Sequence, residues 1–452
     1  MRGTSVLIAG AGLAGLTAAR HLAKWGVSVT VIEAQRRTGG RVLTMREPFR
    51  FRQHAEAGAD LIDDSQDAMC TLIAEMGLRR APILGDGFTG LRHDARGRLV
   101  GGRKGWFDLQ RRLRPEIRAL CASEQRWDGG VAETLARESV GGWLARTRAP
   151  KPIRELAQGM RGFFLSDPDD LSLLALVDQF AEDGVPGEEK MFRVLGGNDR
   201  LTTKLARGLG NRLHLDTILR RVRQTARGVT ATVESGGRVH EQRADYLVCA
   251  MPATTVRDVI FDPHMPDAQQ NAIASLKYGA ATKTALQFNR AVWRRRGRPR
   301  AFGTALPIGA VWDGNEEQRG GASGWSRRRE GANAGILTLM AGGGASASTR
   351  AMLAEGGPAA IIRQMTWLTL EETDLLAWTS MSWESDPWAR GGYAYFDPSF
   401  APCDRSWLAR PFERVYFAGE HTSLRWQGSM NGAVESGLRA AEEIAVRERA
   451  GA

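Results

Sequence analysis

Three glycines near the amino terminus have the spacing of a loop that holds phosphate groups. They stand in the segment GAGLAG, residues 10–15. Gly10 permits a tight turn, Gly12 lets a pyrophosphate approach the backbone, and Gly15 permits close packing of a helix on a strand. The acid Glu33 follows 18 residues after Gly15, close to the ~20 residues at which a carboxylate accepts hydrogen bonds from ribose hydroxyls. These residues predict that the chain binds a dinucleotide.

The segments around this loop complete a βαβ unit. Residues 6–9 are an apolar run typical of a buried parallel strand. Residues 16–25 have helical spacing, Gly26 stands where that helix would end, and residues 27–32 are a second apolar run. Free N–H groups at the start of the helix would face the phosphates. We therefore expect an α/β fold with a Rossmann-like domain. Glu33 would repel a 2′-phosphate, which disfavours NADP and leaves NAD and FAD.

Composition and charge narrow the classes of protein to which the chain could belong. The 452 residues are enough for two or three domains. The formal net charge of +11 comes mostly from arginine, in short runs such as residues 294–296 and 327–329. No basic stripe interleaved with aromatic residues appears, so we expect a solvated basic surface and no nucleic-acid partner. The four cysteines stand far apart without a CxxC pair, which predicts neither a disulfide framework nor a metal site.

The amino-terminal residues also bear on location. They run directly into the apolar strand at residues 6–9, without the charged start and cleavage site of a signal peptide. No stretch of ~20 apolar residues occurs, so we expect no membrane span. The expected location is cytoplasmic.

Three further segments extend the first motif. Glu33-Ala34 is followed by Gly39-Gly40-Arg41, and the carboxyl-terminal part contains YFAGEHT at residues 416–422 and WQGSMNGAVESG at residues 426–437. These segments, with GGNDRL at residues 196–201, resemble the flavin amine oxidase superfamily, which includes monoamine, polyamine and L-amino-acid oxidases. The resemblance spans the whole chain and implies that FAD is the dinucleotide.

The resemblance also implies the cofactor contacts. Arg41 would contact the pyrophosphate as a fixed fork of donors, and the Gly419-Glu420 turn would lie against the ribityl and phosphate groups. Met430 would begin a last helix that points at the flavin ring and stabilises its reduced anion, with plain core packing as the alternative. Tyr393 replaces the cysteine that tethers flavin in some relatives, so FAD should be non-covalent. The full expected set is Gly10, Gly12, Ala14, Gly15, Glu33, Arg41, Gly58, Ala59, Leu219, Gly419, Glu420 and Met430.

The implied reaction moves a hydride from the carbon next to an amine to flavin N5, giving an imine and, with oxygen, hydrogen peroxide. The cofactor carries this chemistry and the protein supplies binding and electrostatics. Lys283 aligns with the lysine that holds a water near N5 in the family, and it is the expected catalytic residue. The alternative for Lys283 is a lysine on the surface of a strand.

Two positions depart from the family pattern. The family frames the amine with two aromatic side chains, whereas this chain has Ala394 and Ser429 at those positions. We expect a wider and more polar pocket over the flavin, and a substrate that is bulkier or more hydrophilic than a simple aryl-alkyl amine. The expected pocket residues are Tyr393, Ala394, Trp426 and Ser429.

The roles of several other residues are left open by the sequence. Trp383 and Trp388 fit the core better than the pocket. His421 could contact flavin or substrate, or be merely hydrogen-bonded, and the resemblance places His54 and Glu56 in the stretch that lies along the flavin. Asp60 could bind a cationic substrate or cap the next helix.

The expected organisation is discontinuous. Residues 1–75, 192–255 and 405–452 would form the FAD-binding domain, with a hairpin turn at residues 235–238. A mixed α+β substrate-binding domain would comprise residues 76–191, which look mostly helical, and residues 256–404, with strands at 283–288 and 335–340.

The leading function is an FAD-dependent oxidase acting on an amine or amino acid. The alternatives are a desaturase or other C–C dehydrogenase of the same fold, and a flavin-binding protein without turnover. The expected partners are a small-molecule substrate and molecular oxygen, with a homodimer left open.

Overall fold

The computed structural model describes residues 3–85, 87–94, 96–102, 105–182, 190–295, 299–318 and 333–450. The basic run 327–329 and Arg296 lie outside these stretches. No helix within them is long and apolar enough to cross a membrane. No group of three His, Cys, Asp or Glu side chains within them could hold a metal ion.

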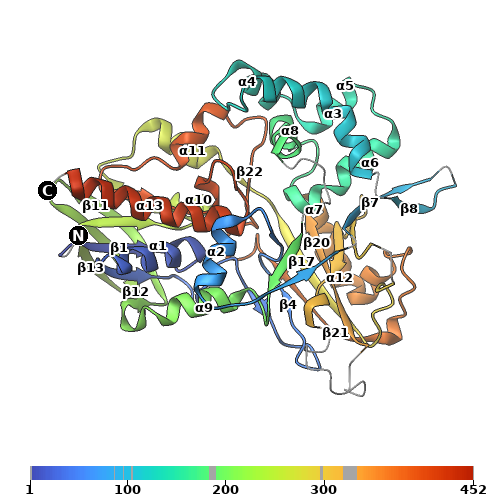
Figure 1. Cartoon of the computed structure of the whole chain (residues 1–452), viewed down its shortest axis with the longest axis horizontal. Coiled ribbons are helices and arrows are strands. Elements are labelled where there is room, and N and C mark those ends of the chain that lie inside the picture. The colour runs from blue at the N-terminus through green and yellow to red at the C-terminus, as the bar shows by residue number, and fades with distance from the viewer. Residues whose placement is uncertain are drawn as a thin grey trace.

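A parallel five-stranded sheet contains the βαβ unit (Figure 1). Its order is β10-β2-β1-β14-β23, and every neighbouring pair is parallel. The strands are β1 (Ser5–Ala9), β2 (Ser28–Ile32), β10 (Leu213–His214), β14 (Tyr246–Cys249) and β23 (Val415–Phe417). Both predicted strands are therefore confirmed. The sheet takes its strands from all three segments assigned to the FAD-binding domain, although the domain boundaries themselves stay a prediction.

Helices cover this sheet and bring the two ends of the chain together. Helix α1 (Leu13–Lys24) begins three residues before the predicted helix, because the last residues of the glycine loop form its first turn. It packs against α13 (Met430–Ala450) at Gly437, where a Cβ atom would lie 2.3 Å from the Ala14 carbonyl oxygen. The Thr4 hydroxyl donates a hydrogen bond to Glu448. Helices α2 (Asp67–Glu75) and α9 (Asp199–Arg207) pack beside them.

A four-stranded sheet follows the order β13-β12-β11-β15. The strands are β11 (Thr217–Thr225), β12 (Gly228–Ser235), β13 (Arg238–Ala244) and β15 (Ile260–Asp262). Ser235 pairs with Arg238 across the tight turn, which confirms the predicted hairpin. Strand β15 comes from beyond residue 255.

A seven-stranded sheet lies at the opposite end of the molecule (Figure 1). Its order is β21-β17-β20-β19-β18-β7-β8. The strands are β7 (Phe88–His93), β8 (Leu99–Gly102), β17 (Ala281–Phe288), β18 (Ala301–Gly303), β19 (Ala310–Asp313), β20 (Gly335–Gly342) and β21 (Leu375–Ser382). All eight residues of β17 are buried. The predicted strands at 283–288 and 335–340 are confirmed, and each is longer than expected. Helix α12 (Gly344–Ile362) packs on β17 and β20.

The first insert is mostly helical, as predicted, and its helices form a layer above the seven-stranded sheet in Figure 1, whereas its strands β7 and β8 belong to that sheet. Its helices are α3 (Gly105–Ala122), α4 (Gly130–Ala136), α5 (Val140–Arg146), α6 (Lys151–Gly159), α7 (Arg161–Phe164) and α8 (Leu173–Glu182). They enclose their own apolar core around Trp143, which is fully buried.

Short elements join these layers. A three-stranded sheet in the order β5-β9-β6 combines β5 (Ile62–Asp63), β9 (Met191–Val194) and β6 (Arg80–Ile83). There are also two antiparallel two-stranded sheets. One pairs β3 (Thr44–Met45) with β4 (Ala55–Glu56), and the other pairs β16 (Lys277–Tyr278) with β22 (Ala394–Tyr395). Helices α10 (Ala253–Val256) and α11 (Asp267–Ser275) follow β14 and β15.

Candidate active site

A cavity of about 390 Å³ is lined by both ends of the chain and by the seven-stranded sheet. It gathers all of the expected cofactor-binding residues except Gly15, together with Lys283, Tyr393 and Ser429. Gly15 instead lies beneath the loop, where a Cβ atom would be 2.0 Å from the Gly10 carbonyl oxygen. Its expected role in close packing therefore agrees with its surroundings.

The glycine loop has room for an anionic group. Gly10 has a φ of +107°, and a Cβ atom there would lie 2.6 Å from the Ala250 carbonyl oxygen. At Gly12 a Cβ atom would meet no atom within 4 Å, so a side chain there would project into the cavity. Gly12 is also the N-cap of α1, and no side chain caps that helix. The uncapped start of the helix thus faces the space that Gly12 leaves open.

Glu33 stands at the end of β2 as a fixed acceptor. It is 6% exposed, and it accepts hydrogen bonds from the backbone N–H groups of Ala11 at 2.7 Å and Gln35 at 2.8 Å. Burial raises the pKa of Glu33, and the two N–H groups oppose that shift. The carboxylate lines the cavity, which places it where a ribose contact is expected.

Arg41 and Glu420 join the two ends of the chain at the cavity. Arg41 Nη1 lies 2.9 Å from Glu420 Oε1 and 2.9 Å from the Gly392 carbonyl oxygen. Burial would raise the pKa of Glu420, but Arg41 outweighs it and the pKa lies below its ordinary value. Glu420 also accepts from the Gly428 N–H at 2.9 Å. Sequence reasoning named both side chains but not their pairing, because nothing in their spacing indicates it.

Lys283 is buried, so the surface-lysine alternative is wrong. Its side chain is 2% exposed, and Nζ donates to the Gly58 carbonyl oxygen and to Asp60 Oδ2, each at 2.9 Å. It also lies 5.1 Å from the centre of the Trp312 ring. Burial lowers the pKa of Lys283, whereas the attraction of Asp60 opposes that shift.

Asp60 is not the cap of the next helix, because α2 begins at Asp67 after the N-cap Gln66. Its carboxylate accepts from Lys283, from Arg193 and, at 2.9 Å, from Trp312 Nε1. Sequence reasoning missed Arg193. The only signal for it is a charged residue inside the apolar run of β9.

The aromatic residues near the cavity differ in part from the expected set. Trp383 and Trp388 line the cavity, whereas Trp426 lines neither of the two cavities described here. Trp383 is also core, since it is 2% exposed and its Nε1 donates to the Ala57 carbonyl oxygen at 2.8 Å. Met430 likewise lines the cavity and packs in the core. Core packing and a place at the site are therefore not exclusive alternatives here.

A second cavity of about 380 Å³ adjoins the first. The two share five lining residues, namely Leu61, Phe163, Tyr393, Gln427 and Gly428. Ala394 lines the second cavity and Ser429 the first. The Ser429 hydroxyl accepts from the Gly432 N–H at 3.1 Å in the first turn of α13. Ser429 therefore serves the helix, and Ala394 faces the added space.

These features fit a bound FAD. The loop is open at Gly12, and an ionisable acid stands at the end of β2. The buried Gln427 Oε1 atom has no hydrogen-bond partner in the cavity wall. The model of the family described as flavin containing amine oxidoreductase matches residues 13–445. The chain belongs to this family.

Relatives of this flavin-containing amine oxidoreductase are similar over nearly their whole length. A protein of Mycobacterium tuberculosis provisionally named a flavin-containing monoamine oxidase is 28% identical over 459 residues, with 97% of this chain and 96% of the relative covered. L-amino acid oxidase Lm29 of Lachesis muta is 26% identical over 460 residues, with 97% and 86% covered. The structure of cyclohexylamine oxidase from Brevibacterium oxydans matches with a TM-score of 0.84 at 23% identity and covers 99% of each chain.

The chain is thus an FAD-dependent oxidoreductase of the amine oxidase type. When bound, FAD would be held by the glycine loop, Glu33, Arg41 and the start of α13, all of which line the cavity. The amino end of α13 would favour negative charge on a bound group.

We expect FAD to leave the chain on denaturation. Tyr393 lines the cavity and donates its hydroxyl to the Phe163 carbonyl oxygen, and none of the described residues lining the cavity is a cysteine. After acid precipitation the flavin absorbance should be in the supernatant. Flavin that sediments with the washed protein would contradict this expectation.

Proposed function

We propose that this oxidoreductase is an oxidase of amines that carry a bulky apolar group, with molecular oxygen as the electron acceptor. When bound, FAD supplies acceptance of a hydride from the carbon next to nitrogen. The products would be an imine and hydrogen peroxide. The observation that carries the proposal is Lys283, which is the only lysine among the described residues that line the cavity.

The chain's own contribution would be mainly electrostatic. The Lys283 ammonium group is fixed by Gly58 and Asp60 at 2.9 Å each, so its position requires no rearrangement during the reaction. A fixed cation in a buried position at the cavity wall favours negative charge that develops beside it. The same group could orient a water, as the family resemblance implies.

The second cavity supports a bulky apolar substituent. Its wall includes eight aromatic residues: Phe88, Trp127, Phe163, Phe164, Phe180, Tyr393, Tyr395 and Phe396. Ligand pockets lined in this way bind apolar groups, and a few polar groups fix their orientation. Of the two substrate types expected from Ala394 and Ser429, this lining favours the bulky one over the hydrophilic one.

Filling the second cavity at Ala394 should change the size preference. Ala394 is 5% exposed and lines this cavity. In Ala394→Phe we expect kcat/KM for a bulky arylalkyl amine to fall about 10- to 100-fold relative to a short unbranched amine, since a mismatch of even one methylene in an apolar pocket is worth about 1–3 kcal/mol. The ratio between the two amines is the measurement, because misfolding would lower both equally. An unchanged ratio would place the bulky group elsewhere.

An L-amino acid with a large apolar side chain is a second candidate. Arg405 and Arg425 line the second cavity, and a guanidinium suits a substrate carboxylate. Arg405 is already engaged, lying 3.7 Å from Asp178 and donating to the Leu424 carbonyl oxygen. Arg425 is exposed, with its guanidinium 5.2 Å from the centre of the Trp426 ring. Because Arg405 is already paired and Arg425 is exposed to solvent, neither guanidinium is a buried, free partner for a substrate carboxylate. A simple amine therefore remains the first choice of substrate.

A substrate panel tests the proposal. It should contain short and bulky amines, the matching L-amino acids, and unsaturated hydrocarbons as desaturase controls. We expect peroxide and the aldehyde that forms from the imine with the bulky amines. Peroxide from amino acids alone would support the second candidate. Turnover that requires an artificial acceptor would show a dehydrogenase, and no turnover would support a flavin-binding protein.

A further inference from the structure

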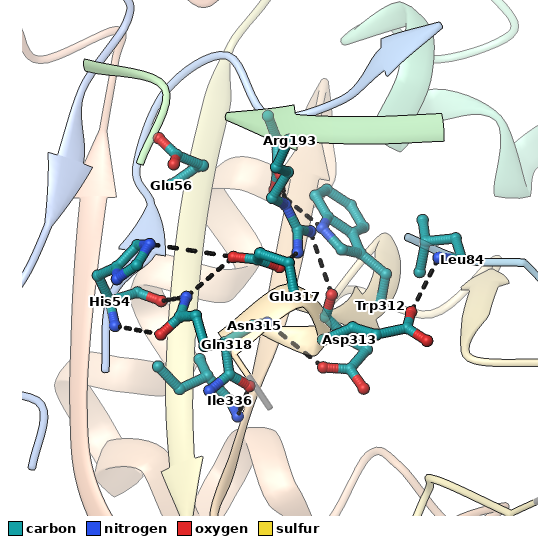
Figure 2. Close-up of polar contacts among 12 residues, drawn as sticks. His54, Glu56, Leu84, Arg193, Trp312, Asp313, Asn315, Glu317, Gln318 and Ile336 are labelled. Carbon is teal, nitrogen blue, oxygen red and sulfur yellow. Dashed lines mark hydrogen bonds and ion pairs between the residues drawn. The ribbon is translucent and has the colours of Figure 1, made fainter. Parts of the chain in front are cut away.

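A line of alternating charges runs from the FAD cavity into the protein behind it. It begins with Lys283 and Asp60, which both line the cavity, and continues through Arg193 to Glu317. The side chains are 2%, 5%, 1% and 1% exposed, respectively. Figure 2 shows Arg193 and Glu317 pointing toward one another, with His54 and Gln318 beyond them. Charges this deeply buried are costly unless they are paired.

Arg193 holds Asp60 from the side opposite Lys283. Its Nε donates to Asp60 Oδ1, whereas Lys283 Nζ donates to Asp60 Oδ2 at 2.9 Å. Trp312 Nε1 also donates to Oδ2, at 2.9 Å. Both oxygens of the carboxylate are therefore occupied by donors, which fixes its plane and its charge.

Arg193 is itself fixed at both ends of its guanidinium. Nη1 lies 2.8 Å from Glu317 Oε2, and Nη2 donates to the Asp313 carbonyl oxygen at 3.1 Å. Glu317 belongs to the short 3₁₀ helix Glu316–Gln318, where Gln318 Nε2 donates to its other oxygen at 2.9 Å. Arg193 does not line the cavity, and among its hydrogen bonds the one to Asp60 reaches a residue that does.

The remaining titratable neighbours add little charge at neutral pH. Burial and Asp60 raise the pKa of Glu56 to about 8, so its carboxyl group is mostly protonated. Burial lowers the pKa of His54, whose ring lies 3.9 Å from Glu317 Oε1. Burial would raise the pKa of Asp60, but Arg193 and then Lys283 outweigh it and the pKa lies below its ordinary value. The charge of Lys283 thus depends on Asp60, and that of Asp60 on Arg193.

We infer that Arg193 is a positioning residue for the reaction, which acts through Asp60 to keep the Lys283 ammonium group charged and fixed at the wall of the FAD cavity. The inference deepens the proposed oxidase function and rests on it. Without Arg193, a carboxylate and an ammonium group would face each other in a dry site. A proton could then move from one to the other and remove both charges.

The test compares four variants loaded with FAD. Arg193→Met combined with Glu317→Gln removes both partners, so no buried charge is left unpaired. Glu317→Gln alone keeps Arg193 on Asp60. Arg193→Lys keeps a cation without the forked contact. Arg294→Met is the matched control, because Arg294 is 6% exposed and pairs with Asp313 at 2.6 Å without touching Asp60 or Lys283.

The readout is the visible spectrum of bound oxidised FAD as a function of pH, which needs no substrate. Loss of Arg193 should raise the pKa of Asp60, as expected for removal of an adjacent opposite charge. The double variant should therefore show a spectral step at a higher pH than any step of the wild type, where Asp60 takes up a proton. The rate of anaerobic reduction by an amine should fall below the same pH.

Glu317→Gln and Arg294→Met should lack the step even if they unfold at lower temperature. If the double variant does not retain FAD, Arg193→Lys decides, with a smaller shift in the same direction expected. A wild-type pH profile in the double variant, or in Arg193→Lys if the double variant does not retain FAD, would overturn the inference. If no amine reduces the wild type, the proposed function fails, while the spectral step still decides the role of Arg193.

Discussion

Gly12→Val should give a folded protein that does not retain FAD. Gly12 has a φ of −73° and a ψ of −179°, which a valine adopts without strain. A Cβ atom there meets nothing within 4 Å, so the substitution disturbs no packing. The added side chain would occupy the space in which the pyrophosphate approaches the backbone. We expect FAD affinity to fall by at least about a hundredfold, since the N–H groups at the start of α1 become inaccessible.

Gly130→Val is the matched control for this change. Gly130 also stands at the start of a helix, α4, with nothing within 4 Å of a Cβ atom, but it is exposed and lines neither cavity. Both variants should unfold within about 0.5 kcal/mol of wild-type apoprotein, as substitutions without packing consequences do. Flavin content after gel filtration is the measurement. Wild-type FAD content in Gly12→Val would mean that the cofactor does not lie in this cavity.

Lys283→Met should slow reduction of the bound FAD by substrate, or its reoxidation by oxygen, by about 10²–10³-fold. This is the usual cost of removing one preorganised charge or donor from an active site. FAD should stay bound, because Lys283 contacts Gly58 and Asp60 and not the glycine loop. The fold should persist, since Asp60 keeps its bonds from Arg193 and Trp312.

Stopped-flow absorbance of the two half-reactions measures this effect. Lys277→Met is the control, because Lys277 is exposed on β16 and lines neither cavity. Its rates should equal those of the wild type. Wild-type rates for both half-reactions in Lys283→Met would remove Lys283 from the mechanism.

The sequence predicted those parts of the fold that local patterns determine. The βαβ unit follows from two apolar runs around a glycine loop, and Gly26 has the positive φ of +80° that a helix end favours. The hairpin at residues 235–238 and the helix that begins at Met430 were likewise readable from short segments. Helix α1 begins three residues before the predicted start. Glycine has a low helix propensity, which favoured a later start, but residues of the glycine loop form the first turn of the helix in spite of that propensity.

The contacts of the candidate site depend on tertiary structure and could not be predicted in this way. Arg41 and Glu420 are 379 residues apart, and Lys283 is 223 residues from Asp60. Sequence periodicity does not indicate which residues so far apart in the chain form contacts. The lining of the second cavity by Ala394 and by helices of the first insert could not be predicted either, because those segments are more than 200 residues apart in the sequence. The family motifs predicted which residues belong to the site, but their contacts with one another depend on tertiary packing.

Anaerobic reduction tests the central claim most directly. FAD-loaded protein is mixed under argon with a bulky arylalkyl amine, and the visible flavin absorbance is followed. The account predicts complete bleaching by this amine, recovery of the colour when oxygen is admitted, and formation of peroxide. No bleaching by any amine or amino acid, in protein whose FAD is bleached by dithionite, would contradict it.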